Sequence, residues 1–225
     1  MSEYVNLKIL AVTRMLNEIC VAGVDESHTW MRPVRQTNLN LLKSDIFQEN
    51  KCVLRNYNVV RFLSKRRLNN VPHSEDFLVD WSYKPTIIKE LDPDARKILY
   101  RRMDQTKDIK NNISSYLKTN KRSLVLVKPD EINGCSWVDS FSGKYKPRIR
   151  FNVNNIPYDF SCTDLRWRAF GRESKNRSGS MDMLNTKDIY FVIGLTRKFR
   201  EDYWPMVVGV HTIPDMKISI DYSNL

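Results

Sequence analysis

The pattern of hydrophobic and polar positions predicts two strand-rich regions separated by a helical segment. In the first region, apolar and β-branched runs predict strands at 7–14, 21–24, 29–34 and 57–63. The last of these strands leads into a basic segment at 64–67, which is predicted to be a turn. Residues 1–85 are therefore predicted to form one small β domain.

The segment 20–34 predicts a hairpin whose turn lies at 25–28, because Asp and Ser side chains bond their own backbone in turns. Side chains two apart on a strand point the same way, so Trp30 and Arg32 share a face. Pro33 cannot donate to a ladder, so the strand ends there or lies at a sheet edge. Trp30 and Arg32 could hold a flat, anionic ligand. Trp30 could equally be a core residue with Arg32 capping it.

A polar stretch before the next apolar run contains His73, Glu75 and Asp76. These three side chains could form an acid–base cluster. The order His-Ser-Glu-Asp before apolar residues is, however, more typical of turn and capping chemistry.

The middle of the chain, residues 86–122, predicts a helical connector packed between two β units. Asp92 and Pro93 supply an N-cap acceptor and a preset first helical residue. The predicted apolar stripe of this helix consists of Ala95, Ile98, Leu99 and Met103, with Arg96, Arg101 and Arg102 off the stripe. A second helix is predicted within 109–117 from the same spacing.

Residues 123–225 predict a second β domain. Its strands are expected at 123–128, 144–151, 189–195 and 206–210. The segment 172–188 contains Gly, Ser, Asn and basic residues with little apolar content, so a long basic loop is predicted there, and we expect limited proteolysis to cut it first.

The strand at 144–151 alternates between cationic and apolar positions. Lys144, Lys146, Arg148 and Arg150 fall on one face. Such a row of like charges needs an opposite charge, which either a polyanion or carboxylates on neighbouring strands could supply.

Two further segments combine cations with aromatic residues. In 165–168, strand-like alternation places Arg166 and Arg168 on one side and Trp167 on the other. The segment 196–205 interleaves cations with aromatic rings, as base-stacking loops do, although a hairpin that closes a barrel would look similar. Its candidate contact residues are Arg197, Lys198, Phe199, Tyr203 and Trp204.

The composition favours a polyanionic partner. The 225 residues carry a formal net charge of +11 and the pI is about 9.5. The four cysteines form no CxxC pair and the three histidines stand far apart, so reduced thiols are expected and neither a metal nor a cofactor is predicted. No apolar run is long enough for a membrane span, so the expected location is the cytoplasm.

Several short motifs in order resemble the prokaryotic dual OB-domain proteins, over roughly residues 7–213. They are Cys-Val-Ala-Gly at 20–23, Trp-Met-Arg-Pro-Val at 30–34, Pro-His-Ser-Glu-Asp at 72–76, Ser-Leu-Val-Leu-Val-Lys-Pro at 123–129, Cys-Thr-Asp at 162–164, Ile-Gly-Leu-Thr at 193–196 and Val-Val-Gly-Val at 207–210. The resemblance implies a mainly β, α+β chain with two five-stranded OB-like barrels joined by helices. It also implies an association with mobile elements and defence loci.

OB barrels bind single-stranded nucleic acid or oligosaccharide, so the leading hypothesis is a binding module for single-stranded DNA or RNA. Its contacts would be the cationic strand, Arg166, Arg168 and the 196–205 segment. The alternatives are an enzyme or nucleotide sensor with a pocket between the barrels, and an adaptor for an acidic protein. The pocket, or else a set of polar side chains that hold the barrels together, would use Trp30, Arg32, His73, Glu75, Asp76 and Asp164.

Overall fold

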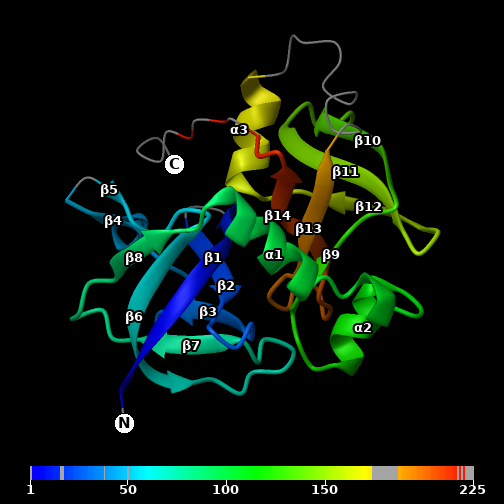
Figure 1. Ribbon diagram of the computed structural model, residues 1–225. Helices are drawn as coiled ribbons and strands as arrows, with labels where there is room; N and C mark the ends of the chain where they lie inside the picture. Colours follow the sequence, from blue (N-terminus) through cyan, green and yellow to red (C-terminus); the bar gives the residue numbers. More distant parts are fainter. Residues whose placement is uncertain are drawn as a thin grey trace.

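The computed structural model describes residues 2–15, 18–37, 39–49, 51–173, 187–216, 218 and 220. Two β-barrels lie side by side, and the helix α1 crosses the junction between them (Figure 1). The predicted loop at 172–188 falls almost wholly on residues 174–186, which lie outside the described residues.

The first barrel closes through five strands in the order β1-β2-β3-β7-β6, with β6 returning to β1. Their bounds are β1 (Glu3–Met15), β2 (Glu18–Val24), β3 (Trp30–Val34), β6 (Asn58–Arg67) and β7 (Asp76–Val79). All neighbours are antiparallel except β3 and β7, which pair in parallel with Arg32 opposite Asp76. The smaller elements are η1 (Lys43–Ile46), β4 (Phe47–Gln48), β5 (Lys51–Cys52) and β8 (Thr86–Glu90), and β8 adds to the outer side of β6.

The second barrel repeats this order. One sheet runs β10-β11-β12 and the other β9-β13-β14, and a parallel bridge between Cys162 and Val207 joins β12 to β14. β9 and β10 follow each other and together play the part of β1, interrupted at Pro129. The bounds are β9 (Leu124–Val127), β10 (Glu131–Val138), β11 (Tyr145–Val153), β12 (Ile156–Ser161), α3 (Leu165–Glu173), β13 (Asp188–Leu195) and β14 (Pro205–Ile213). Two five-stranded barrels are thus confirmed.

The connecting helices are α1 (Pro93–Met103), η2 (Thr106–Asp108) and α2 (Ile113–Thr119). Asp92 caps α1 as predicted, because its side chain accepts a hydrogen bond from the Ala95 amide. The predicted apolar stripe is wrong at one position. Ile98 is 59% exposed, whereas Tyr100 is buried beside Leu99.

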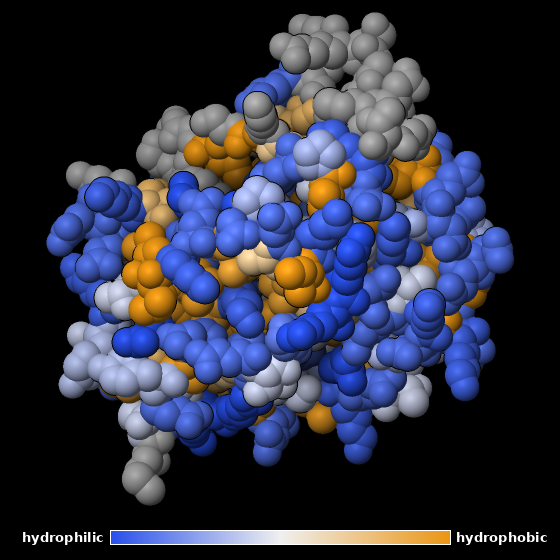
Figure 2. Space-filling view, viewed as in Figure 1, coloured by the Kyte–Doolittle hydropathy of each residue, from blue (hydrophilic) through white to orange (hydrophobic). Residues whose placement is uncertain are grey.

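Three apolar cores hold the molecule together. One fills each barrel, and the third lies between them, where α1 packs against strands of both. This third core contains Trp30, Leu99, Tyr100 and Val208. The helical connector is therefore part of a continuous interface. Figure 2 shows the apolar side chains that remain at the surface over β8 and α1, where Ile87, Ile88 and Ile98 are exposed.

Two local predictions are wrong. The segment 64–67 is not a turn, because β6 continues to Arg67 and pairs there with β7. Residues 165–168 do not alternate as a strand, because they begin α3, where Arg166 and Trp167 are both buried. Asp164 accepts from the Trp167 amide at 2.6 Å and so caps that helix.

Candidate functional site

Four of the predicted pocket residues meet Arg197 where the barrels touch. We call these five residues the junction cluster: Arg32, His73, Glu75, Asp76 and Arg197. The Asp76 carboxylate is fully buried and accepts from Arg32 Nε at 2.6 Å and from Arg197 Nη1 at 2.7 Å. Arg32 comes from the first barrel and Arg197 from the second. One carboxylate therefore joins two guanidinium groups across the junction.

His73 completes this arrangement as a neutral side chain. Arg32 Nη2 lies 2.7 Å from its Nδ1, and its Nε2 lies 3.1 Å from the Thr196 carbonyl oxygen. A guanidinium can only donate, so Nδ1 accepts and the Nε2 proton points to the carbonyl. Burial, together with the charges of Arg32 and Arg197, lowers the pKa of His73 to about 2. His73 is thus a positioning group without a mobile proton near neutral pH.

Glu75 binds the start of β9. Its carboxylate accepts from the amides of Ser123 and Leu124 and from the Ser123 hydroxyl. Each of these groups belongs to the second barrel, so Glu75 is a further link between the two halves.

The other two predicted pocket residues lie apart from the junction cluster. Trp30 is in the core between the barrels. Asp164 caps α3, and its Oδ2 atom is buried with no partner among the described residues. Burial raises the pKa of Asp164 to about 6. The six residues therefore do not form one pocket, and the predicted alternative of polar links between barrels describes four of them.

The predicted cationic and aromatic contacts gather on one barrel. In the second barrel the loop between the first and second strands is 139–144, and the loop between the fourth and fifth strands is 196–204. β11 is the second strand, and its burial pattern alternates as predicted, with Ile149 buried and Lys146 and Arg150 exposed. In OB barrels these two loops and the face of the second and third strands form the ligand surface.

The sequence match agrees with this topology. Residues 5–210 match the family model of the dual OB-containing domain. The chain belongs to this family. No curated protein matches it. Within the described part of this dual OB domain, no helix has the length and apolar character that crossing a membrane requires.

Carboxylates on β12 and in the 139–144 loop balance half of the cationic row in this dual OB domain. Arg148 pairs with Asp159 on β12 at 2.9 Å, and Lys146 lies 3.5 Å from Asp139. Lys144 and Arg150 have no carboxylate partner among the described residues, and the Arg150 guanidinium lies over Gly134 instead. Carboxylates therefore balance Lys146 and Arg148, and the predicted polyanion for Lys144 and Arg150 stays a prediction.

The two loops expose aromatic rings. Phe141 is completely exposed at the tip of 139–144, and Phe199 and Trp204 are 60% and 53% exposed in 196–204. The second loop is also anchored, because Arg197 binds Asp76 and the Tyr203 ring packs edge-on against His73. Lys198 pairs with Glu201 within the loop. Exposed rings on an anchored loop suit stacking with a flat ligand.

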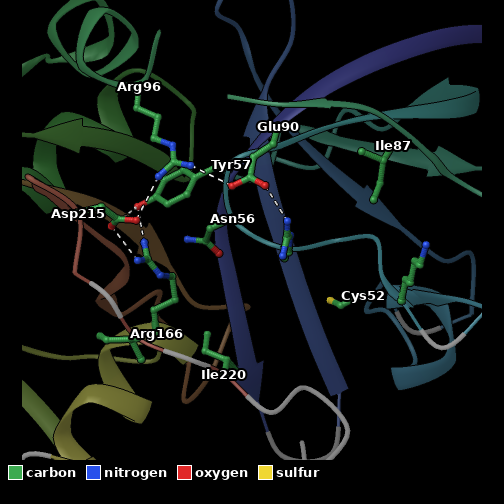
Figure 3. Close-up of a pocket in the computed structure, with 12 residues that line it drawn as sticks. Cys52, Asn56, Tyr57, Ile87, Glu90, Arg96, Arg166, Asp215 and Ile220 are labelled. Atoms are coloured by element: carbon green, nitrogen blue, oxygen red, sulfur yellow. Dashed lines mark hydrogen bonds and ion pairs between the residues drawn. The ribbon is translucent and has the colours of Figure 1, made fainter. Parts of the chain in front are cut away.

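Sequence reasoning missed a cleft of about 500 Å³ lined by the first barrel, α1, α3 and the segment after β14 (Figure 3). Asp215 accepts there from Arg96 at 3.1 Å and from Arg166 at 2.7 Å. The Arg96 guanidinium stacks over Tyr57 at 3.7 Å, and Arg166 donates to the Tyr57 hydroxyl. Arg166 is thus held in a buried network, while Arg168 stacks on Tyr145 at the start of β11.

This arrangement had no local signal. Arg96 and Asp215 stand 119 residues apart, and nothing in either neighbourhood indicates the other. Glu90 binds both Arg55 and Arg96, so each arginine of this cleft already has a carboxylate partner. We therefore interpret the cleft as a structural contact between the barrels.

Proposed function

We propose that this dual OB domain binds single-stranded nucleic acid across the second barrel. The observation that supports the proposal is the strand order of the second barrel. The exposed cations of β11 and the aromatic loops 139–144 and 196–204 belong to the second strand and to the loops that commonly bind ligands in OB barrels. These features come from segments that are far apart in sequence.

The chemistry of this surface fits an extended strand of nucleotides. Same-face cations on β11 are about 6.6 Å apart, since a strand rises about 3.3 Å per residue, and this is similar to the phosphate spacing of an extended single strand. Exposed rings provide stacking surfaces for unpaired bases, and each stacked base contributes about 1–3 kcal/mol to the binding free energy. The net charge of +11 adds long-range attraction to a polyanion. A duplex keeps its bases stacked inside and would use only the cations.

The test changes the two cations that lack carboxylate partners. We expect the double variant Lys144→Gln/Arg150→Gln to bind a labelled single-stranded oligonucleotide more weakly. The slope of log affinity against log salt should fall by ~1.4, because two phosphate contacts are lost from a single strand. The matched control is Arg61→Gln/Lys65→Gln, which removes the same charge from exposed positions on β6 of the first barrel.

Stacking is tested separately. Phe199→Ala should weaken single-stranded binding with little change in the salt slope, because a ring carries no charge. Phe199→Ala should weaken binding of a duplex of the same length by less. If Lys144→Gln/Arg150→Gln and its β6 control lose affinity equally, the attraction comes from net charge alone and the proposed surface is wrong.

A further inference from the structure

A second cavity, which we call the connector cleft, lies between the first barrel and the helical connector. It measures about 530 Å³, within the range of small-ligand sites. Its walls come from the β2–β3 hairpin, the end of β6, residues 74 and 75, the end of α1 and the segment after α2. It shares Glu75 with the junction cluster and has no lining residue in common with the cleft of Figure 3.

The lining of the connector cleft has an excess of positive charge. It contains Arg67, Arg102 and Arg122, and its single carboxylate is Glu75. Glu75 is already occupied, because its oxygens accept from the Ser123 and Leu124 groups at the start of β9. This one carboxylate can offset at most one of the three guanidinium charges, so the lining keeps a net positive charge.

The three arginines are only weakly engaged by the protein. Arg67 lies 3.7 Å from its nearest carboxylate, that of Asp25, and is half exposed. Arg122 donates to the neutral Gln105 amide oxygen at 3.2 Å. Arg102 is exposed and has no ion-pair partner in the described part of the chain. In the cleft of Figure 3, by contrast, every arginine has a carboxylate within 3.1 Å.

Two apolar side chains also contribute to the wall. Trp30 and Met103 both line the cleft and are otherwise buried. The indole nitrogen of Trp30 has no acceptor among the described residues, although it is buried. The remaining lining includes the neutral polar side chains of Thr29, Ser74 and Asn120. A planar ring beside Trp30 and an anionic group beside the arginines would use both kinds of wall.

We propose that the connector cleft binds a small phosphate-bearing ligand of the size and class of a mononucleotide. Guanidinium groups match phosphate oxygens with paired donors, and the net positive charge of this cleft's lining is what such an anion requires. The site is separate from the surface proposed for single-stranded nucleic acid, because it is built from the first barrel and the connector.

The test is a calorimetric titration of the full chain with adenosine monophosphate, with adenosine and inorganic phosphate titrated separately. Arg102→Gln should weaken binding of the nucleotide by at least about tenfold, since a hydrogen bond to a charged group is lost. The matched control is Arg101→Gln, because Arg101 is the preceding exposed residue of α1 and does not line the cleft. The affinity of the Arg101→Gln variant for adenosine monophosphate should stay within about twofold of the wild-type value. Both variants should melt at the wild-type temperature.

Three further outcomes separate this site from the second barrel. Lys144→Gln/Arg150→Gln should bind the mononucleotide normally, and Arg102→Gln should bind the oligonucleotide normally. An oligonucleotide without a terminal phosphate should not displace the mononucleotide. Displacement by that oligonucleotide, no measurable heat with adenosine monophosphate, or equal losses in the two α1 variants would each overturn the proposal. Failure of oligonucleotide binding alone would leave this site standing and would count only against the proposed function.

Discussion

The Asp76 carboxylate can be removed with little change of shape, by the substitution Asp76→Asn. Its two oxygens each bind a guanidinium group, at 2.6 Å to Arg32 and 2.7 Å to Arg197, and its side chain is fully buried. An asparagine in this place keeps one acceptor, turns an NH₂ group toward one arginine and loses the charge. Arg32, which is itself buried, would then retain an uncompensated positive charge.

Breaking a buried ion pair by removing one partner costs about 3–5 kcal/mol. A typical domain is stable by only about 5–15 kcal/mol, so we expect Asp76→Asn to lose about a fifth or more of the free energy of unfolding. Urea denaturation near neutral pH, followed by tryptophan fluorescence, measures this quantity. Because Asp76 links the barrels, the unfolding transition should also be broader than that of the wild type, or divide in two.

The control is Asp159→Asn, the same chemical change in an exposed pair with Arg148. Its cost should be below about 1 kcal/mol. A loss below about 1 kcal/mol for Asp76→Asn as well would refute the reasoning, because the junction cluster would then contribute no more than a surface ion pair.

Two other predictions concern stability. Leu99→Ala should destabilise the protein by about 2–4 kcal/mol in urea denaturation, because Leu99 packs in the core between the barrels, whereas Ile98→Ala should cost less than about 0.5 kcal/mol at its exposed position. Burial lowers the pKa of His73 to about 2 and of His211 to about 3, so only their unfolded forms take up protons below about pH 6.5. The free energy of unfolding should therefore fall on acidification, by roughly 1 kcal/mol per histidine and pH unit. Asp164, whose folded pKa is about 6, offsets roughly half of that below pH 6. Equal or greater stability near pH 5 than near pH 7 would contradict this account of the histidines.

Much of the fold follows from local pattern. Buried and exposed residues alternate along Tyr145–Val153 because one face of this strand packs into the barrel. Asp92 indicates the start of α1, because the first amides of a helix need a hydrogen-bond acceptor. The error at 165–168 had a usable signal, since Asp164 before an apolar turn is also an N-cap. Four residues are too few to distinguish the period of a helix from that of a strand.

The site was less accessible to sequence reasoning, because its partners are distant. The sequence identifies four of the polar side chains, which are Arg32, His73, Glu75 and Asp76. Their contacts with Ser123, Leu124 and Thr196 could not be predicted, because these depend on how the barrels dock. The Arg96–Asp215 ion pair has no signal in the sequence, because it needs a single residue at each of two distant positions and these create no repeating pattern. Periodicity reports burial along one element, and it carries no information about which element lies opposite.

The junction cluster also leads to a prediction about binding that separates position from charge, given the proposed function. Arg197 begins the loop that exposes Phe199 and Trp204, and Asp76 holds that arginine from the other barrel. Removing a carboxylate and releasing an arginine makes the protein more positive, so electrostatics alone predicts that Asp76→Asn binds an oligonucleotide more tightly. If the cluster fixes the loop for stacking, the same variant should bind more weakly, because the rings lose their position and ordering them costs free energy.

Fluorescence anisotropy with a labelled single strand, measured without denaturant where the variant is folded, decides between these signs. We expect weaker binding of the single strand and an unchanged or tighter interaction with a duplex, which does not use the rings. Asp159→Asn is again the control, since it adds the same charge directly beside the cationic strand and leaves the loop anchored. Tighter single-strand binding in both variants would show that the loop needs no anchor, and that the cluster acts only on stability.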